Sequence, residues 1–203
     1  MAIRAVIFDI GGVLVSESDW SHLLRWAATL GMSTDDLGAR LGAVDREGRA
    51  TTGDLTETDM RAGWSRELGL DAEQTDAFVR DVWDLYCGVP DRAMIEFARS
   101  LRPAYRTGLL SNAVDGARRE ESRRYGLDTL TDDLVYSHEV HLAKPDPAIY
   151  HLACERLEVE PGEAVFVDDR PENVDAAADL GMHAFLHADD TAATIALVRA
   201  LAP

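Results

Sequence analysis

The chain has few cysteines and no long run of apolar residues. Cys87 and Cys154 are the only cysteines in 203 residues, and they form no CxxC pair. A disulfide framework is therefore excluded, and reduced, partly buried thiols point to the cytoplasm. No stretch approaches the roughly eighteen apolar residues of a membrane span. The apolar N-terminal run ends on the carboxylate of Asp9, so it predicts a strand and not a signal peptide.

Positive charge is also scarce. The sequence has 20 Lys and Arg against 37 Asp and Glu, a formal net charge of −17. Nucleic acid is excluded as a partner, because binding a phosphate backbone needs clustered basic side chains. The one basic run, residues 118–124, alternates in sign at helical spacing and predicts a solvated helix face. A locally positive site can still bind phosphate, so a small phosphorylated metabolite stays compatible with this charge.

Apolar residues make up 46% of the chain, enough for a substantial core. Residues 5–8 form a continuous apolar run, which is typical of a strand buried on both faces. Residues 16–87 show helical periodicity only, and predict a small four-helix insertion. Its helices are expected near residues 20–30, from 33 to about 48, 56–68 and 71–85.

After Pro90, strand-like and helical segments alternate, which predicts βαβ units and a parallel sheet in an α/β fold. We expect helices ending at 101 and 125, at 147–157 and 171–180, and from 190 onward. The predicted strands are 105–110, 134–137, 164–167 and 183–186.

Polar side chains follow four of the apolar segments. In chain order they are Asp9, the pair 111–112 (Ser-Asn), Lys144 and the pair 168–169 (Asp-Asp). The carboxyl ends of parallel strands share one edge of a sheet, so these groups are expected in one crevice. A lone carboxylate, a hydroxyl with an amide, a lysine and a carboxylate pair are what phosphoryl transfer through an aspartyl nucleophile and magnesium requires.

The first two segments suggest a nucleophile and a phosphate site. Asp9 precedes Gly11 and Gly12, and glycines let backbone groups approach a ligand closely. We interpret Asp9 as the nucleophile that forms an aspartyl-phosphate; the alternative is a carboxylate that caps the next turn. Ser111, Asn112 and nearby amides at the N-terminus of the following helix would hold phosphoryl oxygens, unless the two are an ordinary N-cap pair.

The last two segments suggest a cation and a metal site. Lys144, if buried, would neutralise the nucleophile and the transferring phosphoryl group; otherwise it is a surface lysine. Asp168 and Asp169 repel each other, and a cation relieves that repulsion, whereas the alternative is a solvated turn. Oxygen ligands without His or Cys suit magnesium better than zinc. Asn173 is either a supporting residue behind these ligands or a plain polar helix residue.

Two further groups are given incidental roles. His138 and His141 flank Glu139 but have no third partner, so they are interpreted as an incidental pair and not a metal site. All four tryptophans fall within residues 16–87, where helix packing is expected and a substrate-facing role for one of them stays open.

The motifs at 8–14, 110–112, 143–147 and 167–169, together with Asn173, resemble those of the haloacid dehalogenase-like hydrolase superfamily. The resemblance covers essentially the whole chain. It implies a Rossmann-like, doubly wound core of residues 1–15 and 88–203. It also implies an inserted helical cap of residues 16–87 and magnesium-dependent phosphatase activity.

The resemblance also implies roles for individual residues. Asp9, the backbone carbonyl of Gly11 and Asp169 would bind Mg²⁺, and Asp168 would position Lys144 or a metal-bound water. Phosphate would be bound by a second set of residues: Gly12, Ser111, Asn112 and Lys144.

One position departs from the family pattern. Most phosphatases of the family carry a second aspartate two residues after the nucleophile, where this chain has Gly11. The missing acid–base group is typically worth about 10²–10⁴ in rate. Three accounts stay open: an easily displaced leaving group, an acid from the segment of Glu17, Asp19 and His22, or a weak or absent activity.

The sequence therefore predicts a monomeric or homodimeric magnesium-dependent phosphatase of a small phosphorylated metabolite, acting through an aspartyl-phosphate. A 2-haloacid dehalogenase needs no metal, so the carboxylate pair at 168–169 disfavours it. A catalytically weak or silent ligand-binding or regulatory protein on the same scaffold is the alternative.

Overall fold

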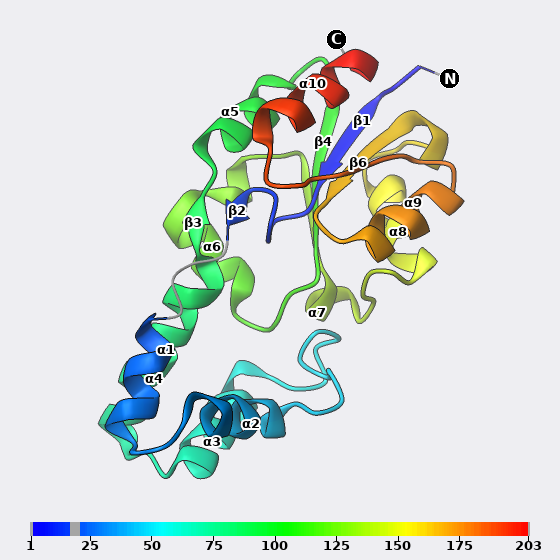
Figure 1. Cartoon of the computed structure of the whole chain (residues 1–203). Helices are drawn as coiled ribbons and strands as arrows, with labels where there is room; N and C mark the ends of the chain where they lie inside the picture. The colour runs from blue at the N-terminus through cyan, green and yellow to red at the C-terminus, as the bar shows by residue number, and fades with distance from the viewer. Residues whose placement is uncertain (1, 17–20, 203) are drawn as a thin grey trace.

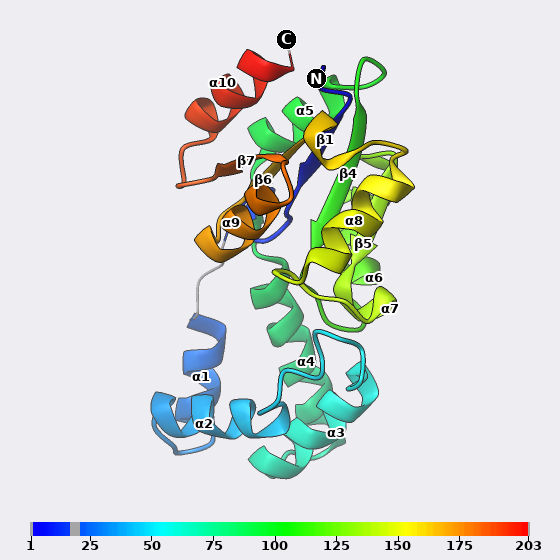
Figure 2. The same cartoon turned by 90° about the vertical axis from the view of Figure 1, so that its right-hand side faces the viewer.

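The structure, a computed structural model, describes residues 2–16 and 21–202, and for His22 only the backbone. A five-stranded parallel sheet forms its centre, in the order β5-β4-β1-β6-β7 (Figures 1 and 2). The strands are β1 Ala5–Phe8, β4 Arg106–Ser111, β5 Asp133–Tyr136, β6 Ala164–Asp168 and β7 His183–Leu186. The chain moves outward from β1 on one side and returns to its other side, as in a doubly wound Rossmann-like sheet.

The central strand β1 is apolar throughout because both of its faces are covered. Its four residues are fully buried, and Phe8 lies in register with Leu109 of β4 and Val167 of β6. One face packs against α5 Arg92–Ser100, α6 Ala117–Tyr125 and α10 Thr191–Leu201. The other packs against α8 Pro147–Arg156 and α9 Pro171–Asp179. The predicted α/β class is confirmed.

Four helices lie together beyond the sheet, and we call residues 21–87 the helical insertion (Figures 1 and 2). They are α1 Ser21–Thr29, α2 Thr34–Val44, α3 Glu57–Leu68 and α4 Ala72–Cys87. Ser33, Thr56 and Asp71 cap α2, α3 and α4, each accepting a backbone N–H three residues on. The insertion has its own apolar cluster, centred on Phe78.

The second of these helices is shorter than predicted. It ends at Val44 and not near Gly48. The Asp45 carboxylate accepts the backbone N–H groups of Arg49 and Ala50 at 2.8 and 2.9 Å. A short acidic side chain that bonds nearby backbone groups competes with helix continuation, so residues 45–55 form turns instead.

Three short elements had no counterpart in the sequence reading. β2 Val15–Ser16 and β3 Val89–Pro90 pair antiparallel, so the chain enters and leaves the helical insertion side by side. Two residues are too few to show any hydrophobic period. The four-residue helix α7 Ser137–Val140 follows β5 directly. Among the described helices, none combines the length and apolar character needed to cross a membrane.

Candidate active site

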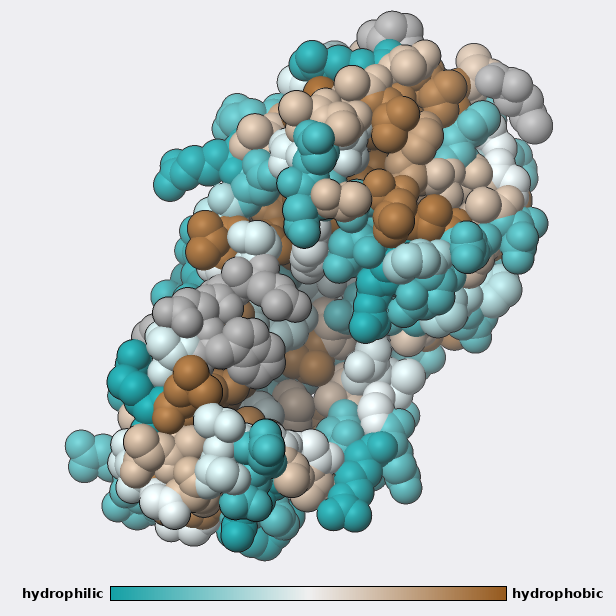
Figure 3. Space-filling model, in the orientation of Figure 1, coloured by the Kyte–Doolittle hydropathy of each residue, from teal (hydrophilic) through white to brown (hydrophobic). Residues whose placement is uncertain are grey.

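The predicted site residues meet at the carboxyl edge of the sheet. Asp9 follows β1, Ser111 ends β4, Asp168 ends β6, and Lys144 lies in the loop before α8. A cavity of about 480 Å³ opens there, and Figure 3 shows the surface hollowed between the sheet and the helical insertion. Every predicted site residue except the fully buried Asp168 lines this cavity.

Lys144 is the buried cation of the site. Its side chain is 1% exposed, and Nζ lies 2.8 Å from Asp9 Oδ1 and 2.6 Å from Asp168 Oδ2. This excludes the surface-lysine alternative. Asn112 fixes the loop that carries it, because the Asn112 amide donates to the Lys144 carbonyl and accepts the Lys144 N–H, both at 2.8 Å. Both amide atoms of Asn112 are thus engaged in positioning Lys144.

Asp168 is surrounded by protein donors. Its Oδ1 accepts the Arg170 backbone N–H at 2.8 Å, and Asn173 Nδ2 lies 3.0 and 3.1 Å from its two oxygens. Lys144 Nζ also donates a hydrogen bond to Oδ2. These donors hold the carboxylate in place. Asp168 therefore orients Lys144, and Asn173 lies directly behind it.

Asp169 approaches Asp9 only because residue 12 is glycine. Gly12 has φ +73°, and a Cβ there would lie 2.3 Å from Asp169 Oδ2. One carboxylate oxygen each of Asp9, Asp168 and Asp169 fall within 4.8 Å of one another. Among the described residues, this is the only cluster of three or more acidic, His or Cys side chains at such spacing.

The charges of this cluster do not balance. Asp9, Asp168 and Asp169 bring three negative charges, and Lys144 brings one positive charge, which leaves −2. Burial is the largest cause that raises the pKa of Asp9 to about 6, with Lys144 opposing it and Asp168 adding to it. Burial and then Asp168 raise the pKa of Asp169. A divalent cation with oxygen ligands fits this excess charge, and Asp9 and Asp169 face the cavity where it would bind.

The placement predicted for Ser111 is wrong in one respect. Ser111 does not lie at a helix N-terminus, because α6 begins at Ala117 after Gly116, whose φ is +93°. The intervening loop is held by another element: the Ala113 N–H donates to Ser137 Oγ at 2.8 Å. Ser111 is therefore no helix cap, and a phosphoryl group beside it would meet a strand end and its loop.

Glu121 is a cavity residue that the sequence reading missed. The run 118–124 was interpreted as a solvated helix face, yet Glu121 is 3% exposed. It lines the cavity with Asp9 and accepts a hydrogen bond from the Tyr136 hydroxyl at 2.7 Å. Burial raises its pKa to about 7. The available signal was its position four residues after Ala117, on the helix face that Ala117 turns to the core.

The residues interpreted as incidental stay outside the cavity lining. His141 Nδ1 lies 2.7 Å from the Thr52 carbonyl, so this histidine contacts the helical insertion. Trp26 and Trp64 pack edge-on against Phe78. Trp83 Nε1 donates to Glu57 at 2.9 Å, which is helix packing as predicted. Glu17 and Asp19, together with the tryptophan at position 20, lie outside the described residues, as does the side chain of His22.

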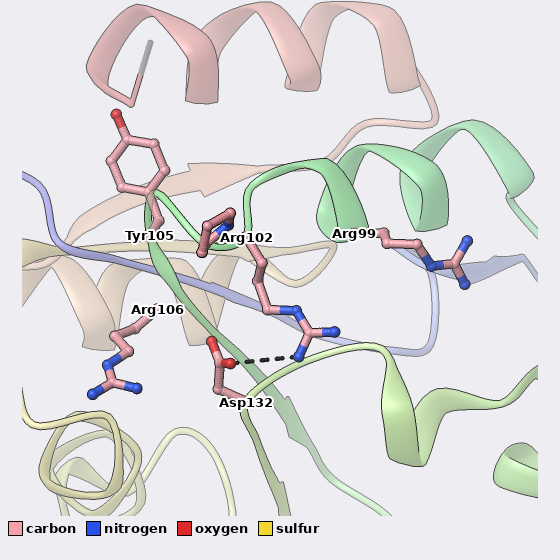
Figure 4. A pocket seen from close by; sticks show the side chains of 6 residues that line it. Arg99, Arg102, Tyr105, Arg106 and Asp132 are labelled. Carbon is pink, nitrogen blue, oxygen red and sulfur yellow. Dashed lines mark hydrogen bonds and ion pairs between the residues drawn. The ribbon is translucent and has the colours of Figure 1, made fainter.

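A second cavity, of about 540 Å³, lies at the opposite, amino edge of the sheet. It is lined by Arg99, Arg102 and Arg106, with Asp132 beside them (Figure 4). The guanidinium groups of Arg99 and Arg106 point away from one another in Figure 4. Each of the three arginines already pairs with a carboxylate. This cavity therefore offers no convergent anion site.

The haloacid dehalogenase-like hydrolase family matches residues 3–181. This chain belongs to that family. A phosphatase of Mycobacterium tuberculosis (strain CDC 1551 / Oshkosh) is 31% identical, over 92% of this chain and 88% of that protein. An (S)-2-haloacid dehalogenase of Pseudomonas sp. (strain CBS-3) is 32% identical, over 89% of this chain and 82% of that protein. A bifunctional epoxide hydrolase of Sus scrofa is 30% identical over 95% of this chain, which spans only 38% of its length.

Solved structures support the same fold. A haloacid dehalogenase family enzyme of Bacteroides thetaiotaomicron, crystallised with magnesium and inorganic phosphate, superposes with a TM-score of 0.75. The two chains are 22% identical, and the match covers 92% of this chain and 95% of the other. The chain is thus a hydrolase of this family, with phosphatases among its relatives.

Proposed function

We propose that the protein is a magnesium-dependent phosphatase that hydrolyses a small phosphorylated metabolite through an aspartyl-phosphate. The observation that carries the proposal is the excess of two negative charges among Asp9, Asp168, Asp169 and Lys144. A dehalogenase shares the nucleophile but has no use for a divalent cation, so the unbalanced carboxylates favour phosphoryl transfer.

Asp9 is the group placed to attack phosphorus. Its Oδ1 is held by Lys144 at 2.8 Å, so the carboxylate is oriented before substrate arrives. Lys144 would also neutralise charge that builds up on the phosphoryl oxygens. The Ser111 hydroxyl and the backbone of Gly12 line the same cavity, and we assign them to binding those oxygens.

Asp9, Asp169 and the backbone carbonyl of Gly11 are the residues that we propose to hold Mg²⁺. When bound, the ion supplies positive charge next to the phosphoryl oxygens and lowers the repulsion between phosphate and carboxylate. Asp168 contributes by fixing Lys144, and Asn173 by fixing Asp168. Asn112 has the same kind of indirect role, because it holds the Lys144 backbone.

We further propose that residues 16–87 form a cap on a catalytic core of residues 1–15 and 88–203. Tyr86, from the end of α4, lines the catalytic cavity. The insertion also contacts the core away from the cavity: Ser137 Oγ donates to the Thr51 carbonyl at 2.7 Å. The Arg119 guanidinium binds both Glu57 oxygens, at 2.9 and 3.0 Å. These contacts would close the cavity over a substrate.

Hydrolysis of p-nitrophenyl phosphate tests the proposal. This substrate releases a phenolate that needs little protonation, so the lack of an aspartate at position 11 should not prevent its turnover. We expect phosphate release that depends on Mg²⁺ and that Asp9→Asn reduces by far more than tenfold in kcat, with the fold intact by circular dichroism. A metal-independent rate, or an Asp9→Asn variant with a tenth of wild-type kcat, would contradict the proposal. A silent ligand-binding protein would show no turnover at all.

A further inference from the structure

Gly11 leaves the departing oxygen of the substrate without the usual proton donor. Another acid from the cavity would have to protonate this oxygen. Among the described residues, six titratable side chains line it: Asp9, Tyr86, Glu121, Lys144, Asp169 and Arg170.

Five of these six are engaged or unsuited. Asp9 is the nucleophile, Asp169 faces the metal position, and Lys144 is bound between two carboxylates. Arg170 is exposed and pairs with Glu172 at 3.6 Å. Burial raises the pKa of Tyr86 well above its ordinary value, so its phenol is a poor acid near neutrality.

The surroundings of Glu121 suit a general acid that is fixed in position. The carboxyl group is buried, and its Oε2 accepts the Tyr136 hydroxyl at 2.7 Å. Among the described hydrogen bonds, Oε1 takes part in none, so this oxygen can carry a proton. Tyr136 is itself fully buried, so the hydrogen bond is protected from water.

We propose that Glu121 is the general acid and base of this enzyme, in place of the aspartate that Gly11 replaces. The proposal rests on the proposed phosphatase activity and deepens it. It also differs from the earlier expectation of an acid in the segment of Glu17, Asp19 and His22.

The proton balance is complete. In the first step an Asp9 oxygen bonds to phosphorus, the bond from phosphorus to the leaving oxygen breaks, and the Glu121 proton moves to that oxygen. In the second step a water oxygen bonds to phosphorus, the bond to Asp9 breaks, and Glu121 takes the water proton. The Tyr136 hydroxyl stabilises the Glu121 carboxylate formed in between.

The titratable groups around Glu121 favour this proton transfer. Burial is the main cause that raises the pKa of Glu121 to about 7, with Asp9 adding to it and the Tyr136 hydrogen bond opposing it. Tyr86 and Cys87 face Glu121 from α4, and Tyr125 faces it from α6. These groups stay neutral near pH 7, since their own pKa values are raised.

Glu121→Gln gives the direct test, because it keeps the shape and the bond from Tyr136 but cannot give a proton. We expect a loss of about 10²-fold or more in kcat/KM on an alkyl phosphate, and little loss on p-nitrophenyl phosphate. Glu120→Gln is the matched control, since Glu120 pairs with arginines and does not line the cavity. It should change neither rate.

Two further variants keep the test decisive if Glu121→Gln folds poorly. Tyr136→Phe removes the bond that lowers the pKa of Glu121, so the alkaline fall of kcat/KM on the alkyl phosphate should move to higher pH. In the Glu121→Gln variant, the added change Gly11→Asp should raise kcat/KM on the alkyl phosphate at least tenfold. No heavy atom lies within 4 Å of a Cβ built at Gly11, so the first side-chain atom meets no clash.

The outcomes separate this inference from the proposed function. If the wild type shows no Mg²⁺-dependent turnover of p-nitrophenyl phosphate, the proposed phosphatase activity itself is contradicted. Turnover with an equal loss on both substrates in Glu121→Gln overturns only the role of Glu121. So does an unshifted alkaline limb in Tyr136→Phe, or a selective loss on alkyl phosphate in variants of Glu17, Asp19 or His22 instead.

Discussion

Two of the residue types that are rare in this chain occur only at its candidate site. Lys144 is the only lysine in the sequence, and Asn112 and Asn173 are the only asparagines. Arginine supplies every other basic side chain, although most of those positions are exposed. The Lys144 ammonium is a compact point charge, unlike the planar guanidinium, and it contacts both buried carboxylates. An amide that both donates and accepts is what holds the Lys144 backbone.

Removing the lysine charge should make folding depend on the metal. Lys144→Met leaves Asp9 and Asp168 buried without their cation, a kind of loss that costs about 3–5 kcal/mol. We expect a Tm well below that of the wild type without Mg²⁺, and a smaller deficit at saturating Mg²⁺. Thermal unfolding followed by circular dichroism measures both, with Arg170→Met as an exposed control. An unchanged Tm would show that the pair contributes little.

Glu121 should destabilise the fold as its carboxyl ionises. Its pKa rises from the ordinary 4.5 to about 7 in the folded protein. A raised carboxyl pKa means that stability is present below pH 4.5 and is lost as the pH rises through 7. The free energy of unfolding of Glu121→Gln should therefore rise relative to that of the wild type as the pH increases between these values, by roughly 3 kcal/mol. Urea unfolding at pH 5, 6, 7 and 8 checks this; a difference independent of pH would contradict it.

Most site residues were predictable because each follows an apolar strand or starts a helix. Asp9, Ser111 and the pair 168–169 needed only the rule that parallel strand ends converge, whereas Lys144 lies in the loop between α7 and α8. Glu121 could not be found in that way. It sits in a strongly charged run, and its burial depends on which side of α6 faces β5.

At the scale of elements, boundaries followed local chemistry where side-chain caps set them. Thr56 and Asp71 form capping boxes, and α3 and α4 begin where these residues predict. The start of α6 was missed because Gly116 caps it without any side-chain hydrogen bond. The two-residue strands β2 and β3 exist only through pairing between distant segments, so no local sequence pattern predicts them.

The turn at residues 50–54 docks the helical insertion onto the core, and Gly53 is its tightest point. A Cβ at Gly53 would lie 2.2 Å from the His138 carbonyl oxygen. Gly48 has a similar left-handed φ, +69° against +79°, but nothing lies within 4 Å of its Cβ. Both alanine variants carry the left-handed backbone cost of about 1–2 kcal/mol.

Only Gly53→Ala must also move the turn away from His138. We expect Gly53→Ala to lower Tm more than Gly48→Ala, because a contact that holds the insertion against the core is weakened. If the insertion is the proposed cap, KM for p-nitrophenyl phosphate should rise as well. Differential scanning calorimetry and steady-state kinetics on the two variants give the comparison. Equal Tm losses would show that the turn does not hold the insertion in place.

At the scale of the whole molecule, the alternation of strands and helices determined the fold class, whereas the placement of the helical insertion was beyond sequence reasoning. That placement depends on a few polar contacts between distant residues, such as Arg119 with Glu57. Such contacts have no periodic signature. The net charge of −17 has a separate consequence, since any cation screens the self-repulsion of so acidic a chain.

A magnesium site must therefore be distinguished from general screening. A ligand that binds only the folded state stabilises it by about 2.7 kcal/mol at a hundred times its Kd, so Mg²⁺ should raise Tm in a saturable way. Asp169→Asn should abolish this response. Asp175→Asn, an exposed position on α9, removes the same charge and should keep the response. Titrating both variants and the wild type with MgCl₂ at constant ionic strength isolates the site. If Asp169→Asn responds like Asp175→Asn, the stabilisation comes from screening, and the metal does not bind at Asp169.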